Sequence, residues 1–406
     1  MQPELAATGL GVITSIGQGK TAFARALLNG DSAFDVMQRP GRQRDSAYAG
    51  AEIRDIVFAP SISPQARRAA SLSAQLALVV LQEAWDEAQL SAVDPCRIGL
   101  VIGGSNVQQR ELAHVHDAYR DRTAFLRPTY GLSFMDSDLC GFCTAQFGIR
   151  GLAFTVGGAS ASGQLAIIQA AQAVLTNQVD VCVALGALMD LSYWECQGLR
   201  ALGAMGSDRY ATQPSLACRP FDRDHDGFIF GESCGAVVIE SLESSERRGV
   251  KPYATLRSWG VAMDGNRNPD PSLDGEIRAI QSALTAARWP AAKVDYINPH
   301  GTGSAVGDET ELAALRACGL TGAYLNATKS LIGHGLSAAG TVEVIATLLQ
   351  MKAERLHPTR NLEHPIDPAF NWAQHEPIEH RIEQALTLSM GFGGINTALC
   401  WQRHPS

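Results

Sequence analysis

Short apolar runs alternate along the chain with longer segments in which apolar residues recur at helical spacing. In the first part, the runs predict strands at 5–12, 98–102, 153–156, 181–185 and 236–240, with helices at 64–90 and 161–175. After a polar run at 241–249, expected to be an exposed joint, a comparable series follows. It predicts strands at 253–261, 294–298, 325–328, 386–390 and 397–401, with helices at 275–287, 309–317 and 338–351. This alternation is typical of an α/β fold whose sheet is covered by helices.

Composition narrows the class of protein. The chain has 406 residues, 46% of them hydrophobic and 18% charged, which indicates a globular protein with a large core. Its net charge of −8 argues against nucleic acid as a partner. The uncharged stretch 151–179 is interrupted by glycine and glutamine, so we expect a buried strand, turn and helix there and no membrane span. Nine scattered cysteines and the lack of a secretory signal pattern favour the cytoplasm.

Several short motifs are incomplete. Gly19-Lys20-Thr21 has Thr14 where a phosphate-binding loop needs glycine, and Gly9-Leu10-Gly11 lacks the third glycine of a dinucleotide fingerprint. Cys140 and Cys143 form a lone CxxC without the second pair that a zinc site needs, so no metal is expected.

Four glycine-rich segments follow predicted strands and carry the candidate chemistry. The first, Thr155 to Gly163, presents Ser160 at a turn before a helix, which is how nucleophiles are commonly exposed. The second and third place His300 and His334 at glycine-bounded turns, with Lys329 five residues before His334. The fourth, Ser389 to Asn396, could supply backbone N–H groups to an oxyanion. Two histidines in such turns favour a functional site over a structural role.

Together these segments resemble the β-ketoacyl-acyl-carrier-protein synthases, the ketosynthases of the thiolase superfamily. The resemblance runs from Thr8-Gly-Leu-Gly-Val to Gly393-Gly394-Ile-Asn396 and includes Arg219-Pro-Phe-Asp222, Asp226-Gly-Phe and Gly231-Glu232. It implies a thiolase-like fold of two similar α/β halves in five αβαβα layers, and a homodimer formed across the sheet edges. The expected halves are 1–249, which carries Ser160, and 250–406, which carries both histidines and the loop at 391–394.

The resemblance also assigns roles to residues. The family's nucleophilic cysteine falls on Ser160, its two histidines on His300 and His334, its lysine on Lys329 and its gating aromatic residue on Phe392. Three acidic residues match supporting positions, namely Asp308, Glu311 and Glu343. Smaller departures from the family pattern are Pro299, Ser304, Gly335 and Met390.

The serine changes the expected reaction. Condensation needs a good nucleophile and leaving group, and a serine hydroxyl requires a base that a cysteine thiol does not. Loss of CO2 from a malonyl thioester needs only the two histidines, which would stabilise the enolate. The resemblance therefore implies a malonyl-acyl-carrier-protein decarboxylase that makes acetyl-carrier protein in a polyketide pathway. By analogy, it would supply acetyl groups for β-branching beside a 3-hydroxy-3-methylglutaryl-synthase-like enzyme.

The expected partner is an acyl carrier protein that bears the substrate on its phosphopantetheine arm, and no bound cofactor is expected. Three alternatives stay open at the level of sequence. Ser160 could be the nucleophile of an acyltransferase with a histidine as its base. The chain could instead be a non-catalytic partner subunit like a chain-length factor, or it could retain some condensing activity.

Overall fold

The computed structural model describes residues 4–267 and 269–404. Five strands of the first half form one part of its large sheet: β1 (Leu5–Thr14), β5 (Ile98–Gly103), β6 (Ala153–Val156), β7 (Val181–Gly186) and β9 (Ser233–Ser241). They lie in the order β1-β9-β7-β5-β6. Strand β9 is antiparallel to both β1 and β7, whereas β7, β5 and β6 run parallel.

The second half repeats this arrangement. Its strands are β10 (Ala254–Met263), β11 (Tyr296–Asn298), β12 (Tyr324–Leu325), β16 (Gln384–Gly391) and β17 (Ile395–Arg403). They lie in the order β10-β17-β16-β11-β12, with the same parallel and antiparallel pairs at matching places. Pairing of β1 with β10 joins the two parts into one sheet. The chain therefore contains two units of the same topology, as the repeated sequence pattern predicts.

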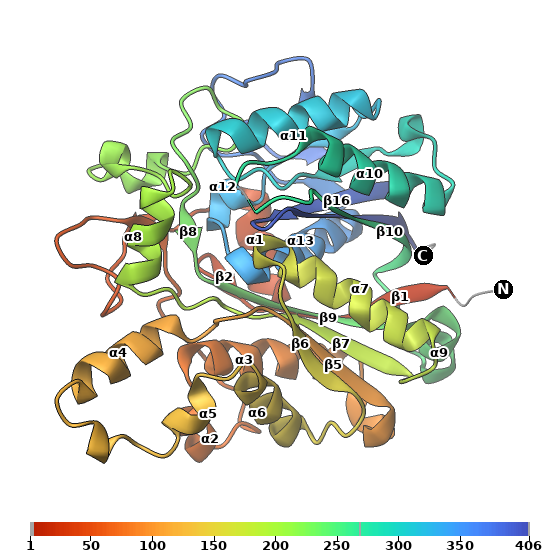
Figure 1. The fold of residues 1–406 in the computed structure, drawn as a ribbon. Helices are drawn as coiled ribbons and strands as arrows, with labels where there is room; N and C mark the ends of the chain where they lie inside the picture. Colours follow the sequence, from red (N-terminus) through yellow and green to blue (C-terminus); the bar gives the residue numbers. More distant parts are fainter. Residues whose placement is uncertain (1–3, 268, 405–406) are drawn as a thin grey trace.

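Helices cover these strands in layers, as Figure 1 shows. On one outer face, α3 (Leu72–Glu87) packs on β1 and β9, with α6 (Ser137–Phe147) beside it. In the middle, α7 (Ser162–Leu175) and α13 (Ala339–Ala353) pack between strands of the two halves. On the other outer face, α10 (Leu273–Ala287) packs on β10 and β17, and α11 (Ala305–Ala317) packs on α10. The result is the predicted order αβαβα.

Shorter elements complete the described part of the chain. The helices are α1 (Lys20–Asn29), α2 (Pro64–Ala69), α4 (Gln109–Tyr119), α5 (Tyr130–Ser133), α8 (Tyr193–Ala201), α9 (Leu242–Arg248) and α12 (Lys329–Ile332). The strands are β2 (Gly17–Gln18), β3 (Asp35–Val36), β4 (Ala49–Ala51), β8 (Phe230–Gly231), β13 (Arg355–Leu356), β14 (Asn371–Trp372) and β15 (Ile378–Glu379).

Two predicted segments were wrong in detail. The single helix expected at 64–90 is two helices, because Ser71 begins α3 as an N-cap whose side chain accepts a hydrogen bond from the Ala74 N–H. The exposed joint expected at 241–249 is the helix α9, which Ser241 caps in the same way. Ser244 and Ser245 of this helix are buried, so the segment packs against the protein. The expected boundary between residues 249 and 250 stays a prediction.

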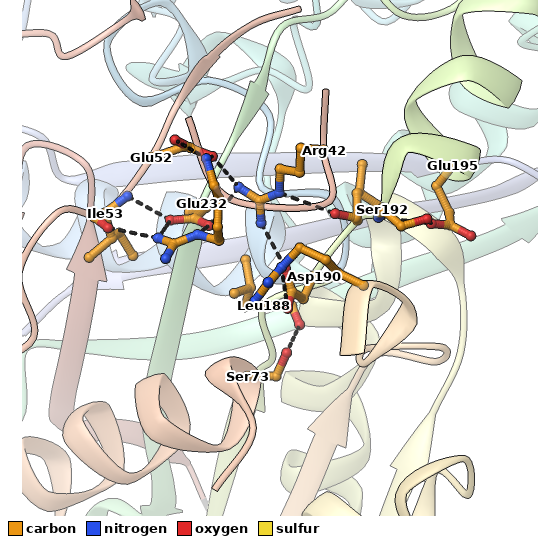
Figure 2. Close-up of polar contacts among 12 residues, drawn as sticks. Arg42, Glu52, Ile53, Ser73, Leu188, Asp190, Ser192, Glu195 and Glu232 are labelled. Carbon is orange, nitrogen blue, oxygen red and sulfur yellow. Dashed lines mark hydrogen bonds and ion pairs between the residues drawn. The ribbon is translucent and has the colours of Figure 1, made fainter. Parts of the chain in front are cut away.

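A buried ion network anchors the loop after β3 (Figure 2). The Arg42 guanidinium is fully buried and lies 2.7 Å from Glu232, 2.8 Å from Asp190 and 2.9 Å from Glu52. Glu232 also accepts a hydrogen bond from the Ile53 N–H at 2.6 Å. Because Glu232 directly follows β8, the network fixes this strand, which borders the candidate site. Across the described residues, the helices include none long and apolar enough to cross a membrane.

Candidate active site

Ser160 lies in the turn that leads from β6 into α7. A short 3-10 turn, Ala159–Ala161, precedes the helix, and Ala159 has a positive φ of 47°, which is unusual for alanine. The Ser160 side chain is buried, and its carbonyl accepts a hydrogen bond from Ser389 Oγ at 3.0 Å. The turn from the first half is therefore held by β16 of the second half.

Hydrogen bonds hold His334 through both its backbone N–H and its backbone carbonyl. Its N–H donates to the Ile229 carbonyl at 2.7 Å, and its carbonyl accepts from the Gly231 N–H at 3.1 Å. The Phe228 ring meets the imidazole edge-on, with 5.2 Å between ring centroids. The segment held by the ion network thus fixes the position of this histidine.

The tautomer of His334 follows from its two hydrogen bonds. Its Nδ1 accepts from the Leu336 N–H at 3.3 Å, so in the neutral ring the proton sits on Nε2. Nε2 lies 2.8 Å from Ser160 Oγ and donates to it. In this state His334 gives a proton to a hydrogen bond with Ser160 and cannot act as the base that would activate the serine.

His300 follows β11 and is positioned by two other site residues. Glu311 of α11 accepts from the N–H groups of His300 at 2.6 Å and of Gly301 at 2.8 Å. Lys329 Nζ donates to the His300 carbonyl and lies 3.4 Å from His300 Nδ1. With Lys329 donating to Nδ1, the neutral ring of His300 also carries its proton on Nε2.

The two imidazoles face one another and are neutral at physiological pH. Their ring centroids lie 5.4 Å apart in an edge-on arrangement. Burial lowers the pKa of both rings well below its usual value, and the positive charge of Lys329 lowers it further. Two neutral imidazoles therefore lie side by side at the cavity, and each carries one N–H of the kind that stabilises a developing negative charge on oxygen. The N–H of His334 donates to Ser160 Oγ when no substrate is bound.

The supporting residues fix the surrounding loops. Lys329 forms a fully buried ion pair with Glu343 of α13, and burial raises the pKa of Glu343 to about 7 while Lys329 opposes that rise. Asp308 accepts hydrogen bonds from the N–H groups of Phe221, Thr302 and Gly303 at 2.6 to 3.1 Å. Asp308 and Glu311 thus hold the segment that follows His300.

A cavity reaches the two histidines. Its lining includes five of the eight residues to which the sequence analysis gave catalytic or supporting roles, namely His300, His334, Asp308, Glu311 and Phe392. The Phe392 side chain is exposed, on the loop between β16 and β17. The other three residues lie outside this lining. Ser160 contacts His334, Lys329 contacts His300, and Glu343 pairs with Lys329.

The sequence analysis assigned no site role to several other lining residues, among them Phe228, Asp264 and Glu276. Phe228 belongs to the Asp226-Gly-Phe motif, so the sequence did contain a signal that could have placed it at the site. Asp264 and Glu276 stand in segments without a motif, and only the folded chain brings them to the cavity.

Comparison with known proteins decides the family. Residues 2–245 match the N-terminal domain of β-ketoacyl synthase, and residues 253–363 match its C-terminal domain. The chain belongs to the β-ketoacyl synthase family. The resemblance found in the sequence is thereby confirmed.

Among its ketosynthase relatives, the chain is 63% identical over 400 residues to the "Polyketide biosynthesis malonyl-ACP decarboxylase PksF" of Bacillus subtilis (strain 168). This match covers 98% of the chain and 96% of the relative. It is 31% identical over 408 residues to the 3-oxoacyl-[acyl-carrier-protein] synthase 1 of Haemophilus influenzae, covering 98% of each.

Solved ketosynthase structures share the fold. One is the complex of a type II polyketide-synthase acyl-carrier protein with its ketosynthase bound to the hexaketide, with a TM-score of 0.88, 25% identity and full coverage of both chains. Another is a β-ketoacyl synthase from Burkholderia phymatum STM815, with a TM-score of 0.90 and 24% identity, covering 99% of this chain and 100% of that one. These matches confirm the predicted thiolase-like α/β fold.

Proposed function

We propose that this ketosynthase decarboxylates malonyl-acyl-carrier protein to acetyl-acyl-carrier protein in polyketide biosynthesis. The observation that carries the proposal is a serine at the nucleophile position beside two intact, neutral imidazole donors. The relative PksF, 63% identical, bears the name of this activity.

The histidines perform the chemical step. The malonyl thioester enters the cavity with its carbonyl oxygen toward Nε2 of His300 and His334. As the bond to the carboxylate breaks, its electron pair forms the enolate and negative charge collects on that oxygen. The Nε2–H groups of His300 and His334 stabilise this charge, and neither needs to lose its proton. The His334 N–H leaves Ser160 Oγ, which it contacts in the free enzyme, for the thioester oxygen. CO2 leaves, and a proton added to the enolate carbon completes the acetyl thioester.

Ser160 explains why condensation does not follow. Its hydroxyl accepts from His334 Nε2, so no base takes its proton and no acyl-enzyme forms. Without an acyl group to attack, the enolate is protonated. The same geometry disfavours an acyltransferase that would use Ser160 as nucleophile with His334 as base.

The decisive experiment follows malonyl-loaded carrier protein by mass spectrometry with the unaltered enzyme and with Ser160→Ala. We expect conversion to acetyl-carrier in both, at rates within a few-fold of each other, because the hydroxyl takes no part in CO2 loss. No conversion above the enzyme-free control would contradict the proposal. An acyl adduct on the protein that depends on Ser160 would favour the transferase instead.

We propose that the carrier's phosphopantetheine arm reaches the histidines past Thr302, Ser304 and Phe392, which line the same cavity. The acetyl-carrier would then serve β-branching, and a cytoplasmic location stays a prediction. Expected supporting roles for Lys329, Asp308, Glu311 and Glu343 rest on the contacts described above.

We also propose a homodimer in which β6 of each copy pairs with the other. In the described part of the chain, β6 ends the large sheet, so one edge of its backbone is open. Phe154 on this strand is exposed, as are Leu132, Phe134 and Met135. An exposed apolar side chain on an open strand edge favours pairing with a second copy of the same surface.

Sedimentation velocity tests the dimer. The unaltered chain is expected to sediment as a dimer, and Phe154→Glu is expected to shift it to monomer by placing a charge at the paired edge. Val57→Glu, at another exposed apolar residue, is the matched control and should remain dimeric. A monomeric unaltered chain would contradict the proposal.

A further inference from the structure

One buried carboxyl group of the cavity has no part in the chemistry described so far. Glu276 lies in the first turn of α10, is 1% exposed and lines the cavity that contains both histidines. Its Oε2 is buried without a hydrogen-bond partner among the described residues. A buried polar group without a partner is costly, so its presence in a reaction cavity calls for a ligand or a reactant.

Glu276 differs from the other acidic side chains that surround it. Asp308 and Glu311 accept backbone N–H bonds, and Asp264 accepts from Asn396 Nδ2 at 2.7 Å. Such donors favour the ionised form of a carboxyl group and oppose the effect of burial. Burial still raises the pKa of Glu311 to about 7 and raises that of Asp264 above its usual value. Within residues 4–267 and 269–404, the Glu276 side chain makes no hydrogen bond of this kind, and no lysine or arginine lines the cavity.

These surroundings favour the neutral form of the Glu276 carboxyl group. Burial raises the pKa of Glu276 well above its usual value, and the nearby carboxyl groups of Glu311, Asp264 and Asp308 raise it further. The two histidines cannot play this part, since a neutral imidazole is a far weaker acid than a carboxylic acid. In its neutral form the Glu276 carboxyl group can donate a proton inside the cavity.

The proposed reaction creates a need for such a donor. A condensing enzyme consumes its enolate by attack on an acyl group, whereas a decarboxylase must protonate the enolate carbon. We propose that Glu276 is the catalytic acid that protonates this carbon after CO2 has left, an inference that rests on the proposed function. The Glu276 O–H bond breaks as the carbon–hydrogen bond forms, and the enolate oxygen returns to a carbonyl. The resulting carboxylate regains its proton from water.

Glu276→Gln tests this role through the fate of the enolate. The amide keeps the size of the side chain but cannot supply the proton, so the enolate lives longer and recaptures CO2. The enzyme is incubated with malonyl-carrier protein and ¹³C-bicarbonate. Mass spectrometry then measures ¹³C entering the remaining malonyl group relative to acetyl-carrier formed. We expect acetyl formation to slow by ~10²-fold, at the low end of general acid catalysis, and the exchange ratio to rise by a similar factor.

Glu309→Gln, an exposed residue of α11, is the matched control and should leave both quantities unchanged. Should Glu276→Gln fail to fold, Glu276→Ala provides a second variant, in which added formate is expected to lower the exchange ratio again. An exchange ratio equal to that of the unaltered enzyme in a folded Glu276 variant would overturn the role of Glu276. Absence of acetyl-carrier from the unaltered enzyme would instead overturn the proposed function itself.

Discussion

Replacing His300 or His334 with alanine is expected to slow acetyl-carrier formation by ~10²–10³-fold, the usual cost of removing one oxyanion donor. Each substitution removes one Nε2–H from the point where negative charge develops. The His334 backbone is held by Ile229 and Gly231 independently of the ring, so the loss should lie in the chemical step. Rates at saturating malonyl-carrier, read by mass spectrometry, measure the effect on kcat.

The control is His375→Ala, because this histidine is exposed and does not line the cavity. It should retain the parent rate. If the His300 and His334 variants did the same, the enolate would not be held by these imidazoles and the mechanism would need another donor.

Lys329→Met is expected to destabilise the protein by roughly 3–5 kcal/mol, the usual effect of leaving one member of a buried ion pair alone. Glu343 is 1% exposed and pairs with Lys329, so the substitution strands a carboxyl group in the core. Activity should also fall, because Lys329 donates to the His300 carbonyl and lies beside its Nδ1. Urea unfolding, followed by tryptophan fluorescence, measures the stability.

The double variant Lys329→Met/Glu343→Gln separates the two effects. A neutral amide removes the unpaired charge, so much of the stability should return, whereas activity should stay low because the contact with His300 is still missing. A double variant no more stable than Lys329→Met would show that the charge of Glu343 is not the source of the loss.

The sequence allowed much of the fold to be predicted because its strands are short apolar runs with glycine or polar residues at their ends. The β6 strand at Ala153–Val156 coincides with its predicted range. Prediction failed where polar side chains act locally. The caps at Ser71 and Ser241 begin helices that hydrophobic periodicity alone does not reveal.

Within the site, the residues that belong to glycine-rich motifs could be found, whereas those placed by long-range contacts could not. Arg42 belongs to no sequence motif, yet it is buried, and Glu232, which lies 190 positions later in the chain, neutralises it. Glu276 lies on a helix with no motif. Its proposed role becomes visible only in the cavity that α10 and α11 form with the loops after β11 and β16.

The hydrogen bond from Ser389 Oγ to the Ser160 carbonyl has a consequence for how the enzyme is made. The ribosome releases the Ser160 turn more than two hundred residues before Ser389, and β17 follows later still. Until β16 and β17 are in place, the growing chain has the helix α7 but no completed catalytic site. Enzymatic activity therefore requires the finished chain, and incomplete translation products that lack β17 should not turn over malonyl-carrier protein.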